Sequence, residues 1–523
     1  MLRNLKKISA RGIILSAVSG LNVTILLAAI FINHIWFWIL SITLSLAVIA
    51  LHNSGQSKHT ILRNFPLLGY FRFVFEAIRP ELRQYFGESD TDGRPFNRRQ
   101  RSIVYQRAKN VRQTVAFGMQ EDPSKPGHEW VAHTVFPVHV EKADLRVVVG
   151  NYQCTQPYNA SILNIGAMSY GALSKTAISS LNQGAALGGF AHNTGEGGIS
   201  EHHLKGGDLI WQIGTGYFGC RDAGGNFSPQ LFKENSARST VKMIELKLSQ
   251  GAKPGHGGIL PAEKNTPEIA AIRNVVQGTT VYSPPAHSAF SNPVELMQFI
   301  GFLRTLSGGK PVGFKICIGD KQEFIDICNA ISVTRILPDF ITIDGSEGGT
   351  GAAPLEFTDN IGMPLYEALS FATQTLLLFG FKQHIKLIAA GRIITAFDLL
   401  KALALGADSC YSARGMMFSL GCIQALKCDS GHCPVGVATQ TPSLYNGLNV
   451  ADKRVRVASF HNNTIKATVE MMEACGFRHT GDINPSKFFR KINPLVTKSF
   501  HDIYFNQVDE APGDTWLKAA ALN

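Results

Sequence analysis

Three cysteines form the most distinctive chemical motif in the sequence. Cys422, Cys428 and Cys433 fall within twelve residues with the spacing C-x5-C-x4-C, and Pro434 follows the last of them. Thiolates are soft ligands, and three on one short loop can hold an iron–sulfur cluster. Three ligands without an obvious fourth indicate a three-iron cluster. The alternatives are three reduced cysteines in a turn, or a zinc site with His432 as fourth ligand, although zinc favours more closely spaced pairs.

Composition and charge narrow the class of protein. The chain has 523 residues, more than one ordinary domain, and its nine cysteines do not form a secreted disulfide framework. Because a cluster motif is present, the expected location of the protein is the reducing cytoplasm. The net charge of +11 is partly local, and no aromatic-basic binding motif accompanies the basic segments. We therefore expect no nucleic-acid partner.

Eight short apolar runs alternate with helical patterns in the middle of the chain, and this alternation predicts an α/β fold built on a (β/α)8 barrel. The expected strands are 161–167, 189–194, 208–213, 243–248, 312–318, 339–344, 386–390 and 407–412, with helices such as 293–306, 365–378 and 396–405 between them. A doubly wound sheet is the alternative, but no G-x-G-x-x-G turn follows the first strand. In a barrel, catalytic groups follow the strands at one face. The cysteine loop follows the eighth strand and belongs to that face.

Two uncharged apolar runs, 13–32 and 35–51, lie near the N-terminus on either side of Asn33-His34. Each is long enough to cross a bilayer, so the pair predicts a transmembrane helical hairpin. An anchor that lies on the membrane is the alternative, because polar residues interrupt the first run. The flanking basic residues are Arg3, Lys6, Lys7 and Arg11 before the first run and Lys58, Arg63 and Arg72 after the second. They place both ends, and the barrel, on the cytoplasmic side.

These patterns divide the chain into four expected segments. They are a membrane anchor of two helices over 1–57, a connector over 58–150, the barrel with its cysteine loop over 151–445, and a helical extension over 446–523.

The loops after the expected strands resemble, in sequence and in order, those of the FMN-binding synthase domain of glutamate synthase. The resemblance spans about residues 160–441 and rests on Met168-Ser169, Gly195–Gly198, Gly251–Gly255, Ser283–Pro285, Gly348–Ala352 and the cysteine motif. It implies a barrel that binds FMN, a [3Fe-4S] cluster on Cys422, Cys428 and Cys433, and reductive amination of 2-oxoglutarate to L-glutamate through an iminoglutarate.

The resemblance also implies which residues contact the flavin. Met168 and Ser169 are expected against the isoalloxazine edge. The expected phosphate-binding residues are Gly348, Gly349, Thr350 and Gly351, with Gly391 and Arg392 as second candidates. A tight turn that needs positive φ is the alternative reading of the four-residue glycine loop.

Charged residues at the strand ends are the expected catalytic and substrate-binding groups. Lys315 lies inside an apolar run, and a buried lysine is costly without an anion, which negative charge on the reduced flavin would supply; the alternative is a rim lysine exposed to water. Lys247 and Lys253 suit a dicarboxylate, although solvated surface charge is the commoner role of lysine. Glu196 is expected to transfer protons or gate ammonia entry, or alternatively to cap a loop N–H. His256 stands where the family leads us to expect a glutamate, and it receives no role.

The expected reaction sequence passes electrons one at a time from the cluster to FMN, and then a hydride to the imine carbon. Compared with full-length glutamate synthase, we expect this chain to lack the N-terminal glutaminase with its nucleophilic cysteine and the long C-terminal β-helical domain. We therefore expect nitrogen from free ammonia, a separate glutaminase subunit or another amine. No NAD(P)H fingerprint is visible, which favours ferredoxin, a reductase subunit or a membrane redox chain as electron donor. An oxidoreductase of the N-methylglutamate synthase type and a membrane-bound electron-transfer module are the alternative functions.

Overall fold

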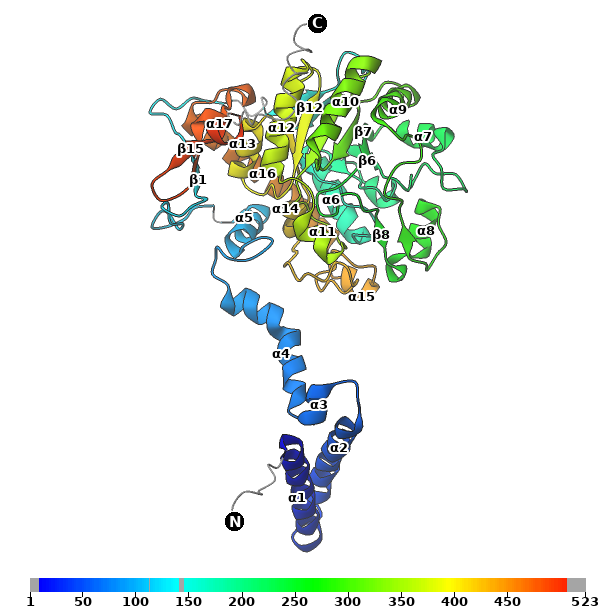
Figure 1. Cartoon of the computed structure of the whole chain (residues 1–523), viewed down its shortest axis with the longest axis vertical. Helices are drawn as coiled ribbons and strands as arrows, with labels where there is room; N and C mark the ends of the chain where they lie inside the picture. The colour runs from blue at the N-terminus through cyan, green and yellow to red at the C-terminus, as the bar shows by residue number, and fades with distance from the viewer. Residues whose placement is uncertain (1–8, 112, 141–144, 506–523) are drawn as a thin grey trace. The chain divides into compact units, whose positions relative to one another are not determined.

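The computed structural model describes residues 9–111, 113–140 and 145–505 (Figure 1). Arg3, Lys6 and Lys7 of the expected basic flank, and residues 506–523 of the expected C-terminal extension, lie outside these ranges. The chain forms two compact units, Met1–Arg98 and Arg99–Asn523. Each unit is described by itself.

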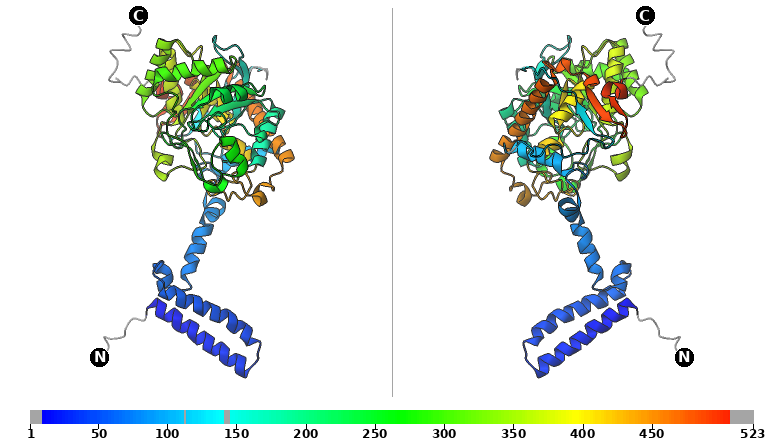
Figure 2. Two further views of the ribbon diagram at one scale, coloured as in Figure 1. Left: turned by 90° about the vertical axis from the view of Figure 1, so that its right-hand side faces the viewer. Right: turned by 90° about the vertical axis from the view of Figure 1, so that its left-hand side faces the viewer.

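The first unit begins with two apolar helices, α1 (Ala10–Phe31) and α2 (Trp36–Gly55), joined by a short turn at the predicted polar break (Figure 2). The side chains of Asn22 and Thr43 join the helices, since Thr43 Oγ1 donates to Asn22 Oδ1 at 3.0 Å and Asn22 Nδ2 donates to the Thr43 carbonyl at 3.2 Å. Both helices are long and apolar enough to cross a membrane. Beyond them lie α3 (Thr60–Asn64), α4 (Gly69–Leu82) and a π-helical turn, η1 (Arg83–Gly87).

The second unit is built on a closed barrel of eight parallel strands, which confirms the predicted fold class. All eight expected strands are present. They are β4 (Leu163–Ile165), β5 (His192–Asn193), β6 (Leu209–Ile213), β7 (Val241–Lys247), β10 (Val312–Ile316), β11 (Phe340–Asp344), β12 (Lys386–Ala390) and β13 (Ser409–Ser412), with β13 closing onto β4. Most of their residues are buried, because side chains fill the barrel on one side and helices cover the other.

The helices between the strands are α6 (Lys175–Gly188), α7 (Pro229–Ser236), α8 (Pro267–Arg273), α9 (Pro293–Leu306), α10 (Lys321–Thr334), α11 (Leu355–Asn360), α12 (Leu365–Leu378), α13 (Ala396–Ala404) and α14 (Arg414–Ser419). Caps of the expected type start several of them: Asn292 accepts from the Glu295 N–H before α9, and Asp320 accepts from the Gln322 N–H before α10. Short pieces in the loops are η3 (Glu201–His203), η4 (Ala262–Lys264) and the strand pair β8 (Ile259–Leu260) and β9 (Val281–Tyr282).

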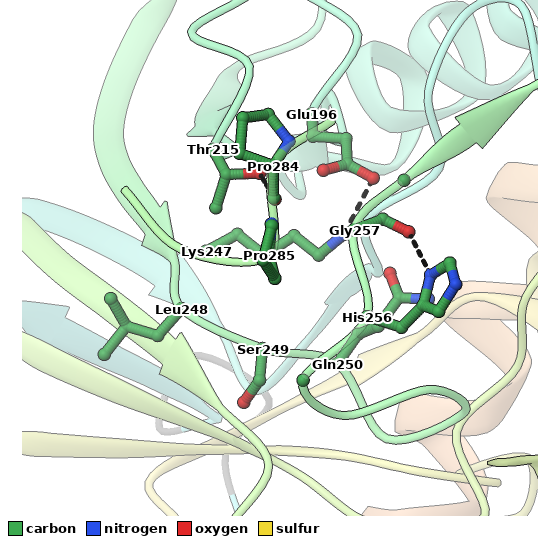
Figure 3. Close-up of a pocket in the computed structure, with 12 residues that line it drawn as sticks. Glu196, Thr215, Lys247, Leu248, Ser249, Gln250, His256, Gly257, Pro284 and Pro285 are labelled. Atoms are coloured by element: carbon green, nitrogen blue, oxygen red, sulfur yellow. Dashed lines mark hydrogen bonds and ion pairs between the residues drawn. The ribbon is translucent and has the colours of Figure 1, made fainter. Parts of the chain in front are cut away.

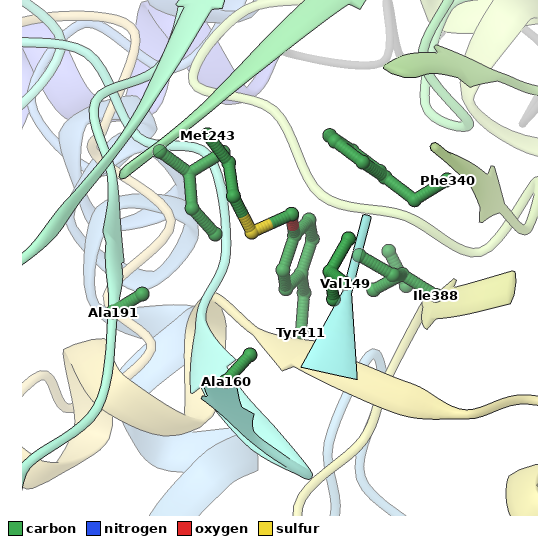
Figure 4. Close-up of a cluster of buried hydrophobic side chains, with 9 residues drawn as sticks. Val149, Ala160, Ala191, Met243, Phe340, Ile388 and Tyr411 are labelled. Atoms are coloured by element: carbon green, nitrogen blue, oxygen red, sulfur yellow. The ribbon is translucent and has the colours of Figure 1, made fainter. Parts of the chain in front are cut away.

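An antiparallel hairpin closes the apolar interior of the barrel. It consists of β2 (Arg146–Val149) and β3 (Tyr158–Ser161). Val149 and Ala160 from this hairpin join a buried cluster with side chains of the barrel strands, among them Met243, Phe340 and Tyr411 (Figure 4). The barrel therefore has a filled apolar core next to this hairpin.

Segments from both ends of the second unit pack together outside the barrel. They are α5 (Arg98–Ala108), β1 (Glu129–Val131), α15 (Pro442–Tyr445), α16 (Val450–Cys475), η5 (Thr480–Asp482), η6 (Pro485–Lys487), β14 (Phe488–Lys491), β15 (Thr497–Ser499) and α17 (Phe500–Tyr504). The long helix α16 lies along α6, where a Cβ on Gly184 would meet Val457 at 2.6 Å. The region expected to be helical also holds β14 and β15, which form a sheet with β1.

A buried ion pair joins a surface helix to the amino ends of two strands. Arg304 of α9 donates through Nη2 and Nε to Asp339 Oδ2 at 2.9 and 3.1 Å, and both side chains are buried. Asp339 also accepts the N–H groups of Val312 and Asn151, at 2.9 and 2.8 Å. One carboxylate thus anchors α9, β10 and the β2–β3 hairpin against the start of β11.

Asp339→Asn should destabilise the second unit by about 3–5 kcal/mol, because it leaves the Arg304 guanidinium buried without its counter-charge. The midpoint of chemical unfolding measures this loss. Lys466→Ala is the control, since Lys466 pairs with Glu470 on an exposed helix face at 3.9 Å. That change should stay within about 0.5 kcal/mol; equal effects of the two substitutions would contradict the role assigned to Asp339.

Candidate functional site

Three neighbouring strands bring charged side chains to the carboxyl end of the barrel. Lys247 is the last residue of β7, Lys315 pairs with it in register on β10, and Asp344 is the last residue of β11. Lys315 Nζ lies 3.2 Å from Asp344 Oδ2, and both side chains are about 10% exposed. Lys315 is therefore no solvent-exposed rim lysine. Its counter-ion is a residue that the sequence analysis missed, although an acidic residue at a strand end was the available signal.

A second carboxylate lies deeper in the barrel beneath these lysines. Glu245, also on β7, is fully buried and accepts hydrogen bonds from Asn193 at 2.8 Å, Gln212 at 2.7 Å and Thr342 at 2.6 Å. Burial opposes charge on Lys315, but Asp344 and Glu245 outweigh it and raise the pKa of Lys315 above its ordinary value. Lys315 is accordingly an ammonium ion at neutral pH.

Glu196 and Lys247 form the central ion pair of the site. Lys247 Nζ donates to Glu196 Oε1 at 2.7 Å (Figure 3). Burial by itself would raise the pKa of Glu196, but Lys247, Arg273 and Lys253 together lower it below its ordinary value. Burial also disfavours the charged form of Lys247, and it lowers the pKa of that side chain below its ordinary value. The hydrogen bond that Glu196 makes is to Lys247 rather than to a loop N–H, so the capping alternative does not describe it.

Two glycines give the Glu196 carboxylate its space. A Cβ on Gly214 would lie 2.5 Å from Glu196 Oε2, and a Cβ on Gly258 would lie 2.9 Å from Oε1. Arg273 of α8 lies on the same side, where it is almost fully buried and donates to the Tyr170 carbonyl at 2.9 Å. Sequence reasoning missed Arg273, because an arginine at the end of a helix carries no motif.

A pocket opens beside this pair (Figure 3). Its lining residues are Glu196, Thr215, Lys247, Leu248, Ser249, Gln250, Gly255, His256, Gly257, Gly258, Pro284 and Pro285. They come from the loops after β5, β6, β7 and β9, all at the carboxyl end of the barrel. Of the two lysines expected to bind substrate, Lys247 lines the pocket. Lys253 instead donates to the Ala352 carbonyl at 2.8 Å and ties the loop after β7 to the loop after β11.

The residues expected at the isoalloxazine edge lie against the glycines of the next loop. A Cβ on Gly195 would approach the Ser169 nitrogen to 2.5 Å, and a Cβ on Gly197 would lie 2.9 Å from the Ser169 side chain. Met168 is buried and Ser169 is half-buried. The loop carrying Met168 and Ser169 is thus fixed directly beside the loop carrying Glu196.

The expected phosphate loop is close-packed on one side and open on the other. Gly348, Gly349 and Gly351 do not have positive φ, so the alternative that these glycines serve a turn needing positive φ is wrong. A Cβ on Gly348 would lie 2.9 Å from Asp344, and one on Gly349 would lie 2.8 Å from Arg414. No heavy atom approaches the Cβ position of Gly351 within 4 Å, and Thr350 is exposed.

Two arginines lie beside that loop. Arg392 has φ of +52° after Gly391, whose φ is +144°. Burial and the like charge of Arg392 lower the pKa of Arg414 to about 10. Two guanidinium groups close enough to repel each other next to a glycine loop suit an anion such as the phosphate of FMN. Arg414 was missed by sequence reasoning.

The three cysteines lie on one irregular loop after β13 and α14. Cys433 is buried, and Cys422 and Cys428 are half-buried. The loop turns through left-handed backbone at Gln424 and Leu426, with φ of +59° and +54°. Burial, with smaller contributions from Cys428 and Cys433, raises the pKa of Cys422 to about 12. The thiols are therefore near enough to act on one another electrostatically.

Two buried cations flank the cysteine loop. Lys264 of η4, 4% exposed, donates to the Cys428 carbonyl, and Arg101 of α5, 6% exposed, acts on Cys422. Among the residues that the structure describes, the Arg101 Nε finds no hydrogen-bond partner. Within the part of the chain that the structure describes, neither cation forms an ion pair with a carboxylate. Buried cations that form no ion pair with a carboxylate suit a site whose ligands become anionic thiolates.

One other group of ligand atoms lies close together. Across the described ranges, the three histidine, cysteine or carboxylate ligand atoms found within 4.8 Å of one another belong to Glu201, His202 and Glu268. There His202 Nε2 lies 2.8 Å from Glu268, which also accepts from the Tyr170 hydroxyl at 2.8 Å, so hydrogen bonds among these side chains explain the contact. In the same ranges, the three cysteine Sγ atoms do not form such a group within 4.8 Å.

Comparisons with known proteins show which family and which relatives this chain is similar to. The profile for the conserved region in glutamate synthase matches residues 131–478. The glutamate synthase large subunit-like protein YerD of Bacillus subtilis is 40% identical over 456 residues, which cover 79% of this chain and 86% of YerD. The archaeal glutamate synthase (NADPH) of Methanocaldococcus jannaschii is 35% identical over 358 residues, covering 68% of this chain and 65% of that protein. A solved flavocytochrome b2 mutant with pyruvate bound is 12% identical with a TM-score of 0.44, covering 88% of this chain and 98% of that one.

Lys247→Met should lower stability on the order of 3 kcal/mol at pH 7, because it leaves Glu196 ionised and buried without its main partner. The ionised form of Glu196 stabilises the native fold above the ordinary carboxyl pKa of 4.5, and that contribution is lost as pH falls through the lowered native pKa. In the variant burial raises the pKa of Glu196, so the deficit should narrow as pH falls toward about 5.

The midpoint of thermal unfolding at both pH values measures this effect. The double variant Lys247→Met/Glu196→Gln is the matched control and should recover most of the lost stability. Additive losses in the double variant would mean that the two side chains are not coupled as the 2.7 Å contact implies.

Proposed function

This chain belongs to the family defined by the conserved region of glutamate synthase, and on that premise we propose that it is an FMN-dependent oxidoreductase that forms L-glutamate from 2-oxoglutarate and ammonia. The observation that carries the proposal is the buried Lys247–Glu196 ion pair, 2.7 Å long, in a pocket at the carboxyl end of the barrel. The reaction consumes one ammonia, two electrons and two protons, and releases one water.

Lys247 and Glu196 supply the charge that the substrate needs. A carboxylate of 2-oxoglutarate entering the pocket would take Lys247 as its cation and so release Glu196 from part of its ion pair. Glu196 then accepts a proton from ammonium and returns it to the departing oxygen as water forms. Arg273 is a positioning residue for Glu196. Lys253 contributes positive potential from the loop and no direct contact, because its ammonium is held by the Ala352 carbonyl.

The residues at the barrel mouth fit FMN. FMN held there would provide the hydride that reduces the imine carbon. Lys315, held as an ammonium ion by Asp344 and Glu245, would stabilise negative charge on the reduced ring. Arg392, Arg414 and the backbone of Gly348–Gly351, with Gly391, would hold the phosphate, and Met168 and Ser169 would border the ring.

The cysteine loop fits a [3Fe-4S] cluster that relays electrons. Cys422, Cys428 and Cys433 would supply three thiolates, and Lys264 and Arg101 would balance the negative charge of the loaded site. Electrons would come from ferredoxin or a reductase subunit, and ammonia from solution or a separate glutaminase subunit. We further propose that α1 and α2 anchor the chain in a membrane with the barrel on the cytoplasmic side.

Purified full-length chain tests the proposal directly. It should show flavin absorbance, bound iron and an EPR signal of a three-iron cluster, and should form glutamate from 2-oxoglutarate and ammonium with reduced ferredoxin. Cys428→Ser should lose the EPR signal but keep the flavin, whereas Cys154→Ser, outside the loop, should keep both. Colourless protein with stoichiometric zinc would contradict the proposal, and a product formed only with methylamine would assign the N-methylglutamate reaction instead.

Lys264→Met should lower the midpoint potential of the cluster by on the order of 60 mV, because removing a buried cation favours the oxidised, less negative form. Potentiometric titration followed by EPR measures the shift. Lys453→Met is the matched control: Lys453 also lies beside the loop, near Gly421, but already pairs with Asp452 at 3.1 Å. An unchanged potential in Lys264→Met would remove Lys264 from the electrostatics of the site.

A further inference from the structure

Helix α4 in the first unit has an apolar stripe that the proposed function does not use. Its apolar residues follow the spacing i, i+3, i+4, i+7 and i+11, which places them along one side of a helix. They are Phe71, Val74, Phe75, Ile78 and Leu82. The neighbouring side carries Arg72, Glu76, Arg79 and, in the following turn, Arg83. The helix thus has an apolar side bordered by a charged one, with Glu81, seven residues after Val74, at the edge of the apolar side.

The apolar side of α4 is exposed. Phe71, Val74 and Phe75 are 59%, 53% and 60% exposed, and Ile78 and Leu82 are 42% and 44% exposed. The stripe continues beyond the helix to Phe86, which is 85% exposed. Isolated exposed apolar residues are ordinary on a protein surface, but a continuous row of aromatic and aliphatic side chains marks a binding surface.

The start of α4 is tied to the end of the apolar hairpin. Asn53, in the last turn of α2, donates through Nδ2 to the Pro66 carbonyl at 2.6 Å and to the Tyr70 hydroxyl at 3.1 Å. Tyr70 belongs to the first turn of α4. If α2 crosses a membrane, its end at Gly55 reaches the membrane surface, and α4 begins at that same level. Figure 2 shows α4 leaving the end of the hairpin at a wide angle to α1 and α2.

The charge of this region matches a membrane surface. Residues 58–83 carry five basic and two acidic side chains, a net charge of +3. Basic side chains next to a membrane segment are attracted by anionic headgroups. Large apolar residues on one side and arginines on the other are the composition of helices that lie in the interfacial layer.

We propose that α4 is an interfacial helix that lies on an anionic lipid surface, with its Phe71–Leu82 stripe in the acyl boundary and Arg72, Arg79 and Arg83 at the headgroups. This inference rests on the proposed membrane anchoring by α1 and α2. It adds a lipid-sensitive contact to that anchor, since the hairpin inserts through its apolar character whereas α4 requires negative headgroups.

Hydrogen exchange of the full-length chain in lipid nanodiscs tests the inference. Discs of phosphatidylcholine alone are compared with discs that also contain phosphatidylglycerol, and exchange is followed in peptides covering residues 10–55 and 69–86. We expect the hairpin peptides to be protected in both discs. Exchange over 69–86 should slow at least tenfold in the anionic discs relative to the neutral ones.

Two aromatic substitutions on opposite sides of α4 give a matched pair. Phe75→Ser, in the apolar stripe, should abolish most of the lipid-dependent protection. Phe73→Ser changes a residue on the side away from the stripe, 39% exposed, and should leave the protection in place. Equal loss in both variants would contradict the proposed orientation.

The other outcomes are separable. A protected hairpin with equally slow exchange over 69–86 in both discs and in lipid-free detergent would mean that protein, either the barrel unit or a second copy, covers the stripe, and would overturn the inference. A protected hairpin with fast exchange over 69–86 in both discs would also overturn it. Fast exchange over 10–55 would contradict the membrane anchor, and with it the inference.

Discussion

The carboxyl end of this barrel depends on opposite charges that are held together out of water. Two lysines on adjacent strands, Lys247 and Lys315, would repel each other if they stood alone in a buried setting. Each has its own carboxylate, Glu196 at 2.7 Å and Asp344 at 3.2 Å, and Glu245 adds negative charge from below. The arrangement keeps Lys315 charged, keeps Glu196 ionised, and leaves Lys247 shared between a protein carboxylate and the pocket.

The glycines around these charges act mainly by leaving room. Gly214 and Gly258 allow the Glu196 carboxylate to sit between two loops, and Gly251 lets the loop after β7 approach the Gly345 carbonyl so closely that any side chain would clash. Gly195 is different, because its φ of +65° is a left-handed backbone conformation that also favours glycine. A site assembled from separate loops needs those loops in fixed positions. Close packing between the loops holds them together as one rigid rim.

The cysteine loop shows the same principle with a different anion. Lys264 and Arg101 are buried cations from segments far apart in the sequence, and they converge on a loop where burial raises the pKa of Cys422 and Cys428. When thiols in such a site release their protons and bind a metal, the resulting thiolates supply negative charge that balances the two cations. In the proposed relay of electrons, both the cysteine loop and the flavin site therefore have buried charges of opposite sign beside them.

The amino-acid sequence alone determined the barrel and most of its rim. The eight apolar runs with glycine-rich ends correspond to the eight parallel strands of the barrel. They could be predicted because buried strands and the loops that follow them each have a characteristic local composition. The same holds for the apolar pair α1 and α2, and for placing Lys247, Lys315 and Glu196 after or within strands. Only the tertiary structure identified Asp344 as the partner of Lys315, Glu245 as the charge below it, and Arg273, Arg414, Arg101 and Lys264 as neighbours of the site. These residues carry no motif, since their importance comes from distances across strands and loops, and such distances exist only once the chain has closed into a barrel.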